Sequence, residues 1–218
     1  MISRHSPGME RRAALWVDLA VKAALVGLLL FAVARPDLPQ FEGKAMTGRA
    51  LLYPLAALLV PFVWWVRGRR DEYPYALDIL LVLPFLIDVA GNALNLYDTV
   101  DWWDDANHFV NWAILVAAFG QLLVRLPVGR WEAFGLAVGF GCVTAVLWEF
   151  AEYFTFIRNS PELRTAYTDT LGDLALGLAG STLAAALTVT LLWRRPQSRD
   201  ESSHRRHEGV TQPRTGRA

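Results

Sequence analysis

Long apolar stretches alternate with short polar connections along most of the chain. The stretches cover residues 14–34, 50–66, 76–97, 106–124, 133–156 and 171–193. Each one approaches the roughly 20 residues that an α-helix needs to cross about 30 Å of hydrocarbon. The sequence does not show the alternation of apolar and polar positions that is typical of membrane β-barrels. The pattern therefore predicts an all-α fold, a polytopic membrane helical bundle with six transmembrane helices.

Composition agrees with this class but does not indicate a function. Hydrophobic residues make up 54% of the chain, nine Trp are present and the formal net charge is zero. The single cysteine, Cys142, lies within a predicted span, so we expect neither a disulfide framework nor a cysteine-based metal site. Glycine-rich phosphate-binding loops and nucleophile elbows are absent from the sequence. We expect membrane lipid as a partner and no nucleic acid.

Arginine and lysine are distributed unevenly among the connections. If the N-terminus is cytoplasmic, fifteen of them lie in inner segments and five in outer segments. Because cytoplasmic segments carry an excess of these residues, we expect both termini to be cytoplasmic. The expected organisation is a cytoplasmic N-terminus (1–13), a six-helix transmembrane domain (14–193) and a tail (194–218). The tail is rich in Arg, Ser and Glu and poor in apolar residues, which predicts a disordered cytoplasmic segment.

The first apolar stretch has two interpretations. Basic residues before it and the sequence Ala32-Val33-Ala34 at its end resemble a cleavable signal peptide. Asp18 and Lys22 interrupt the stretch, and its full length suits a membrane span better. A retained helix is therefore favoured, and cleavage would leave five spans with the same orientation.

Ionisable side chains gather where three predicted spans reach the outer side of the membrane. Judged from a rise of about 1.5 Å per residue, they lie at one depth. The members of each pair are three or four residues apart, so they share one helix face. Ionisable groups are costly in or near hydrocarbon, so this layer predicts a functional site. Its members are Asp104 and His108, Glu149 and Glu152, and Asp169 and Asp173, with Asp88, Asn92, Asp105, Thr170, Arg158 and Arg164 as supporting residues.

The two glutamates give the strongest signal in this layer. Glu149 and Glu152 lie toward the C-terminal end of a helix, where the helix dipole disfavours negative charge. Aromatic residues follow them, so their surroundings are apolar. Two such carboxylates need a cation, a shared proton or an arginine to offset their repulsion. His108, Arg158 and Arg164 are candidate partners within the chain, and a bound divalent metal ion is the alternative.

Other members of the layer also have structural interpretations. Asp169 or Thr170 is a candidate cap for the last helix. Asp88 and Asn92 are typical of hydrogen bonding between membrane helices. His108, taken alone, is more often a hydrogen-bonded core residue than a metal ligand. These interpretations leave the glutamate pair as the least explained feature.

Small residues recur at four-residue spacing on the last two spans. Gly135 with Gly139, and Gly177 with Ser181, form two such faces. This spacing lets helix backbones approach closely. We therefore expect both faces to pack against neighbouring helices.

The residues of the polar layer also resemble a known family. The patterns D-x-x-x-H-F, E-x-x-E and D-T-x-x-D occur in this order, as Asp104–His108–Phe109, Glu149–Glu152 and Asp169–Thr170–Asp173. On these segments the chain resembles the YjdF-like family of bacterial inner-membrane proteins over residues 14–193. The order of the acidic pairs is also similar to VanZ-like membrane proteins, which are linked to envelope and glycopeptide phenotypes. Asp105 stands where the family pattern leads us to expect a basic residue, which favours an external cation.

The resemblance implies six helices in the bacterial inner membrane but no established reaction, so three hypotheses remain. The first is a metal-dependent membrane enzyme acting on a lipid or envelope precursor, with Glu149, Glu152 and His108 as candidate catalytic residues. The candidate metal ligands are Asp104, His108, Glu149, Glu152, Asp169 and Asp173. A divalent metal ion there would activate water or hold a phosphate. The second hypothesis is a proton- or cation-coupled transporter, and the third is a non-catalytic membrane scaffold.

Overall fold

The computed structural model describes residues 7–192, which form an all-helical bundle. The long helices are α1 (Pro7–Ala34), α2 (Met46–Val66), α3 (Tyr75–Ala93), α5 (Trp103–Leu123), α6 (Arg130–Thr155) and α7 (Ala166–Leu187). Shorter elements are α4 (Leu96–Thr99), three 3₁₀ helices (Pro39–Phe41, Ile157–Asn159 and Pro161–Arg164) and a π-helical turn (Thr188–Leu192). Within this range, six helices are long and apolar enough to cross a membrane. The predicted six-span fold is therefore confirmed, and the tail predicted for residues 194–218 lies outside the described residues.

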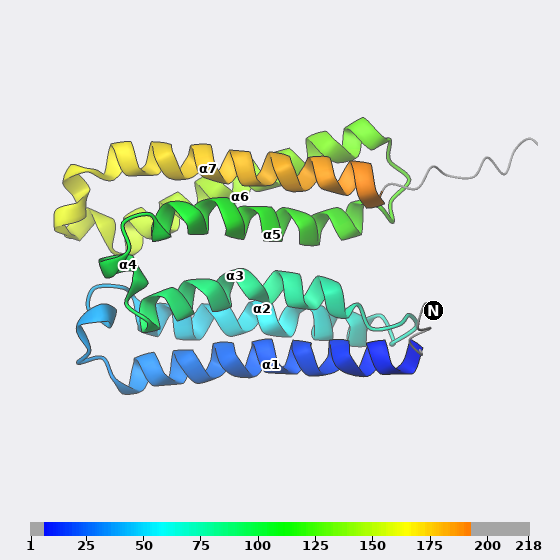
Figure 1. The fold of residues 1–218 in the computed structure, drawn as a ribbon, viewed down its shortest axis with the longest axis horizontal. Helices are drawn as coiled ribbons and strands as arrows, with labels where there is room; N and C mark the ends of the chain where they lie inside the picture. The colour runs from blue at the N-terminus through cyan, green and yellow to red at the C-terminus, as the bar shows by residue number, and fades with distance from the viewer. Residues whose placement is uncertain (1–6, 193–218) are drawn as a thin grey trace, which may run out of the picture.

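The bundle consists of two halves with three long helices each (Figure 1). Helices α1, α2 and α3 make the first half, α5, α6 and α7 make the second, and α4 joins them at one end, which we call the α4 end. Each half has its own hydrophobic core, which includes Leu25 and Val82 in the first and Val116 and Ala185 in the second. Helices α3 and α5 pack against each other along the seam between the halves.

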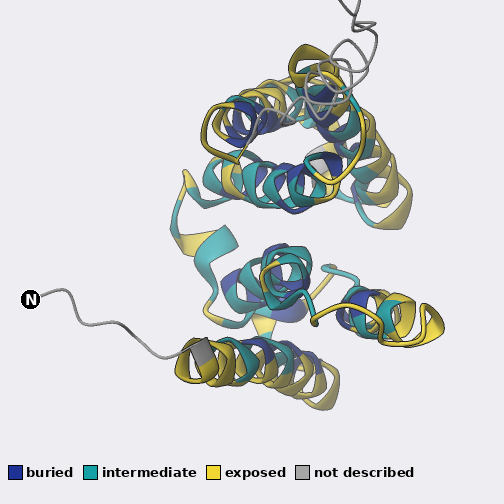
Figure 2. Cartoon of the chain, turned by 90° about the vertical axis from the view of Figure 1, so that its right-hand side faces the viewer, coloured by how far each residue is buried: buried dark blue, intermediate teal, exposed yellow. Residues whose placement is uncertain are grey.

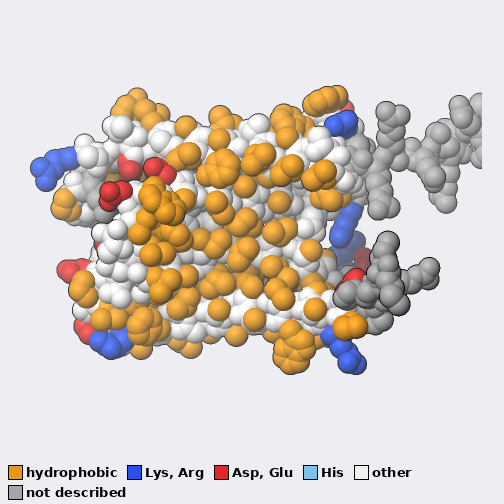
Figure 3. All heavy atoms as spheres, viewed as in Figure 1, with side chains coloured by type: hydrophobic (Ala, Val, Ile, Leu, Met, Phe, Trp, Pro, Cys, Tyr) orange, Lys and Arg blue, Asp and Glu red, His pale blue; other side chains and the backbone are white. Residues whose placement is uncertain are grey.

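The lipid-facing surface follows from the apolar stretches. Large side chains such as Leu51, Leu55 and Phe62 of α2 are exposed. Viewed along the helices, exposed residues lie mainly on the outside of both halves (Figure 2). Hydrophobic side chains cover the middle of one face, and charged ones gather toward its two ends (Figure 3). Helix α1 begins and α7 ends at the same end of the bundle, opposite the α4 end.

Helix boundaries differ from the predicted ones for local reasons. The third span, predicted to reach residue 97, ends at Ala93 because Asn95 adopts a left-handed backbone conformation with φ of 59°. The last helix begins at Ala166 instead of residue 171, and Thr165 takes the cap position. Asp169 and Thr170 therefore lie inside the helix, and the interpretation of either as its cap is wrong. Helix α1 likewise begins at Pro7, before the predicted start at residue 14.

Helices α5 and α7 cross at close range because α7 presents glycines to α5. A methyl group on Gly180 would collide with the backbone carbonyl oxygen of Phe109, and one on Gly177 would approach the indole of Trp112 to 2.7 Å. Gly177 thus has the packing role that its spacing predicts. A methyl group added to Gly139, in the other predicted face, would enter open space. The packing role expected for that face is therefore wrong. The close crossing at Gly180 brings the first turns of α5 and α7 together.

Candidate functional site

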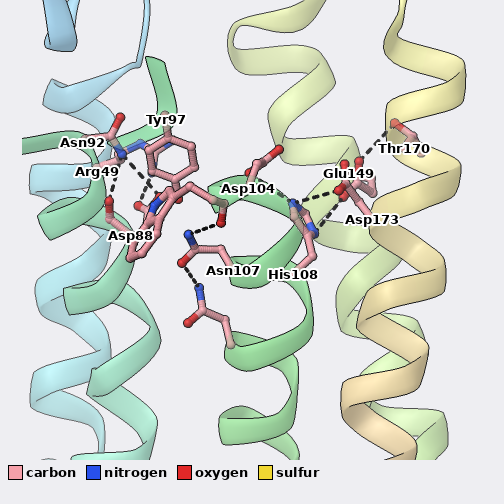
Figure 4. A network of polar contacts seen from close by, with 12 residues as sticks. Arg49, Asp88, Asn92, Tyr97, Asp104, Asn107, His108, Glu149, Thr170 and Asp173 are labelled. Carbon is pink, nitrogen blue, oxygen red and sulfur yellow. Dashed lines mark hydrogen bonds and ion pairs between the residues drawn. The ribbon is translucent and has the colours of Figure 1, made fainter. Parts of the chain in front are cut away.

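The first turns of α5, the first turns of α7 and the last turns of α6 meet near the α4 end of the bundle (Figure 4). His108 lies one turn after Asp104 on α5 and points toward Glu149 of α6 and Asp173 of α7. His108, Glu149 and Asp173 are buried, and Asp104 is half-buried. These four residues and Glu152 are called the His108 site below.

Three carboxylates surround the imidazole of His108 at nearly equal distances. Nε2 lies 3.7 Å from Asp104 Oδ1 and 3.6 Å from Asp173 Oδ1, and Nδ1 lies 3.7 Å from Glu149 Oε1. These separations exceed the roughly 2.7–3.2 Å of an N–H···O hydrogen bond. The buried Nδ1 has no hydrogen-bond partner among the described residues. Ligands about 2.1 Å from one tetrahedral metal ion are about 3.4 Å apart, so the two spacings at Nε2 suit side chains that share an ion.

Two overlapping groups in the site have the composition of a metal centre. Asp104, His108 and Asp173 form one group, and His108, Glu149 and Glu152 form the other. In each group, one candidate ligand atom per residue lies within 4.8 Å of the others. Asp104 and Asp173 lie at Nε2 of the imidazole, and Glu149 lies at Nδ1. A neutral imidazole carries a proton on one nitrogen and offers the other as a ligand, so it can bind an ion on one of these sides. Carboxylates with one imidazole suit several divalent ions.

The two glutamates lie close together on α6 but line different cavities. Thr170 Oγ1 donates a hydrogen bond of 3.1 Å to Glu149 Oε2, which holds this carboxylate beside His108 Nδ1. Glu149 and Thr170 line a largely apolar hollow between α6 and α7. Glu152 lines a second cavity, whose walls come mainly from α3, α5 and α6. Glu149 can therefore orient the imidazole, whereas Glu152 can meet a molecule in that cavity.

Four predicted members lie at the edge of the site or outside it. Asp105 and Asp169 are exposed, and neither belongs to the two groups above. Arg158 and Arg164 are also exposed. Within the described residues, neither arginine forms an ion pair with the two glutamates. Neither of the two arginines that the sequence offered as partners therefore offsets the charge of the glutamates.

Asp88 and Asn92 belong to a separate set of polar residues, which we call the Arg49–Asp88 cluster. Asp88 accepts hydrogen bonds from Arg49 of α2, from the Tyr53 hydroxyl (2.7 Å) and from the Tyr97 hydroxyl (2.9 Å). Asn92 lies on the next turn of α3 and donates to the Asp88 carbonyl oxygen at 2.9 Å. Burial, together with the negative charge of Asp88, raises the pKa of Tyr97, so its hydroxyl stays a donor.

Sequence reasoning missed this pairing. The interpretation of Asp88 as a residue that hydrogen-bonds between helices is correct, but the sequence analysis does not identify Arg49, one of the five outer basic residues, as its partner. The available signal was an arginine at the start of one span and an acid in the outer half of the next. Such a pair lies at the same depth when the two helices are antiparallel.

A cavity of about 340 Å³ lies beside both clusters. Its walls come from α3, α5 and α6, and from Tyr97. Asp104, His108 and Glu152 reach it from the His108 site, and Asp88 reaches it from the Arg49–Asp88 cluster. A volume above about 300 Å³ is typical of small-molecule sites, so the cavity gives a ligand access to the His108 site.

A third polar cluster lies at the opposite end of the bundle. Lys22 of α1 donates to Asp18 at 3.1 Å and also to Asp78 of α3. Tyr73 donates to Asp78 as well, and burial raises the pKa of Tyr73, so its hydroxyl stays protonated. The residues that interrupt the first apolar stretch therefore tie α1 to α3.

Comparison with known proteins supports the membrane assignment. A model of the family described as predicted membrane protein DUF2238 matches residues 18–194. A Thermotoga maritima protein, described as uncharacterized, is 30% identical over 134 residues, which cover 55% of this chain and 69% of that protein. No solved structure matches the chain. The predicted resemblance to YjdF-like membrane proteins is confirmed, and the resemblance to VanZ-like proteins stays a prediction.

Proposed function

The chain belongs to the DUF2238 family of predicted membrane proteins, and from this premise we propose that it is a metal-dependent enzyme of the bacterial inner membrane. Its His108 site binds a divalent metal ion at the outer face. The ion promotes hydrolysis of a membrane lipid or a lipid-linked envelope precursor that reaches the site through the adjacent cavity.

The spacing of carboxylates around one imidazole is the observation that carries this proposal. Three carboxylates lie 3.6–3.7 Å from His108, and two of them, Glu149 and Asp173, are buried. Buried carboxylates are strongly destabilising unless a cation compensates them. Within residues 7–192, no arginine or lysine forms an ion pair with either buried acid. A divalent ion would supply that compensation and would bring the ligands to bonding distance.

Each residue of the site then has a separate role. Asp104, His108 Nε2 and Asp173 are the ligands. Glu149, fixed by Thr170, would accept a hydrogen bond from Nδ1–H of the imidazole once the ion is bound, as carboxylates commonly do beside metal-bound histidines. Glu152, on the cavity side, takes a proton from the attacking water and returns it to the leaving group.

The orientation of the bundle has its own test. The excess of arginine in the inner connections supports cytoplasmic termini and an outward-facing His108 site. In a Cys142→Ala background, a membrane-impermeant maleimide added from outside should label Asp101→Cys but not Arg69→Cys. External labelling of Arg69→Cys would show that the proposed orientation is wrong.

Turnover tests the enzymatic part. Protein purified in mild detergent, stripped with chelator and reloaded with Mg²⁺, Mn²⁺ or Zn²⁺, is incubated with bacterial lipid extract, and the products are identified by mass spectrometry. We expect products only with a metal. Glu152→Gln should retain the metal but lower the rate about 10²–10⁴-fold, because it removes the acid–base group. Asp169→Asn, an exposed control, should keep both properties. Equal turnover by the stripped protein and the reloaded protein would contradict the proposal.

A further inference from the structure

The lining of the cavity beside the His108 site changes from polar to apolar along its length. Helices α5 and α6 run in opposite directions, so both contribute polar residues near the α4 end and apolar residues farther away. The polar end is lined by Asp104, His108 and Glu152, and the apolar part by Trp112, Leu115, Phe140 and Leu147. From Asp104 to Leu115 the wall of α5 extends for about 16 Å at the helical rise per residue. The cavity is therefore elongated, with a polar end and a long apolar part.

The cavity also opens sideways toward the hydrocarbon of the membrane. Helices α3 and α6 both contribute to its walls, but within residues 7–192 they make few direct contacts with each other. Leu147 lines the cavity while its side chain is 58% exposed, so it lies at the rim. These wall positions belong to candidate membrane spans. A molecule dissolved in the bilayer could therefore enter between α3 and α6.

A buried polar atom indicates what lies near the boundary between the two parts. Asn111 lines the cavity and donates a hydrogen bond of 3.1 Å to Asn107, which in turn donates to the Trp103 carbonyl oxygen at 2.9 Å. Asn111 Oδ1 is buried and has no hydrogen-bond partner among the described residues. Leaving a buried acceptor unpaired costs about 1–3 kcal/mol, so a donor on a bound molecule would stabilise the complex.

The charges at the polar end of the cavity determine which headgroup a bound amphiphile can have. Asp88 is already paired with Arg49, so the carboxylates that remain for a ligand belong to the His108 site. A divalent ion bound there would attract a phosphate, as metal ions do in phosphoryl chemistry. Without the ion, the same acids would repel a phosphate and attract a cationic head.

We propose that this cavity binds one amphiphile, with a phosphate head at the His108 site and a single aliphatic chain along the apolar part. A hydroxyl or amide group next to the head donates to Asn111 Oδ1, and the molecule enters between α3 and α6. Because a phosphate is accepted only with the ion in place, this inference rests on the function proposed above.

Photolabelling tests the occupant. The full-length protein, in nanodiscs of neutral phosphatidylcholine with Mn²⁺, is exposed to an alkyl phosphate that carries a diazirine on its chain. We expect the label on cavity residues such as Leu115 and Phe140. Unlabelled alkyl phosphate should compete for labelling, whereas inorganic phosphate, which cannot use the apolar part, should not.

Cavity-filling variants provide the matched comparison. Thr144→Trp and Ala151→Phe each add bulk to a residue that lines the cavity. Each should lower labelling about tenfold or more, which corresponds to about 1.4 kcal/mol of binding free energy. Val143→Trp, next to Thr144 but 61% exposed, should label as the parent does. Two filling variants are used so that one remains informative if the other fails to fold.

The outcomes separate this inference from the function that it rests on. If the parent binds metal but neither filling variant loses label, the cavity inference is wrong and the metal site stands. If the parent binds no metal and labels equally with and without Mn²⁺, the proposed function is wrong and the phosphate assignment is wrong with it. Stronger labelling of the metal-free protein by a trimethylammonium amphiphile would also overturn the phosphate assignment.

Discussion

The two polar clusters near the α4 end provide different partners for their buried carboxylates. In the Arg49–Asp88 cluster, one carboxylate receives an arginine and two tyrosine hydroxyls. In the His108 site, three carboxylates surround one imidazole at 3.6–3.7 Å, too far for direct hydrogen bonds. The first cluster contains its own cation. The second has side chains that could hold a metal ion, and residues of both clusters line the same cavity.

This difference shows why a buried acid alone does not identify a function. Asp88 and Glu149 are both buried acids in apolar helices, and both belong to the predicted polar layer. Their partners distinguish them. Asp88 pairs with Arg49, whereas Glu149, within residues 7–192, contacts Thr170 and the imidazole and forms no ion pair with an arginine or a lysine.

The largest effect is expected at the Arg49–Asp88 cluster. Arg49→Met should destabilise the protein by about 3–5 kcal/mol, because it leaves the carboxylate of Asp88 buried without its cation. Thermal unfolding in detergent measures the loss. Arg35→Met is the control, since Arg35 pairs with Asp37 on the exposed surface and its removal should change little. If the two variants have equal melting temperatures, the Arg49–Asp88 pair does not stabilise the fold.

A smaller loss is expected where α5 and α7 cross. Gly180→Ala should destabilise the bundle by about 1–3 kcal/mol, because the added methyl group meets the carbonyl oxygen of Phe109. The same change should weaken metal binding, since the crossing sets the distance between His108 and Asp173. Gly139→Ala adds its methyl group to open space and should be neutral or slightly stabilising. Melting curves that coincide for the two variants would show that the crossing is not tight.

The smallest effect on stability is expected at Glu149. Glu149→Gln should leave the metal-free protein as stable as the parent or slightly more stable, because it removes a buried charge. It should also lower metal affinity about 10–100-fold, because the amide oxygen is a weaker acceptor than the carboxylate for the hydrogen bond from the imidazole N–H. Melting temperatures with and without chelator measure both effects. A metal-free parent combined with a more stable variant would favour the scaffold hypothesis over the enzyme.

The spans and the depth of the polar layer were predictable because they depend on local patterns. Hydropathy determines which segments can cross a membrane, and the helical rise then fixes the depth of Asp104, Glu149 and Asp173. The three helices that carry these acids meet at the His108 site. The same reasoning gave Asp88 the correct depth but no partner.

The partners were not predictable because they depend on how helices turn toward one another. Arg49 and Asp88 are 39 residues apart, and nothing local to either one specifies the pairing. Spacing alone also gave equal weight to the Gly139 and Gly177 faces, although only Gly177 contacts another helix. Asp169 and Asp173 share a helix, yet only Asp173 turns toward His108.

The most direct test of the central claim is the divalent metal content of the protein purified in mild detergent, measured beside Asp173→Asn and Asp169→Asn. Our account predicts a stoichiometric metal ion in the parent and in Asp169→Asn, whose altered side chain is exposed, and its loss in Asp173→Asn. A parent that takes up no divalent metal, or an Asp173→Asn variant that binds it as the parent does, would contradict the account.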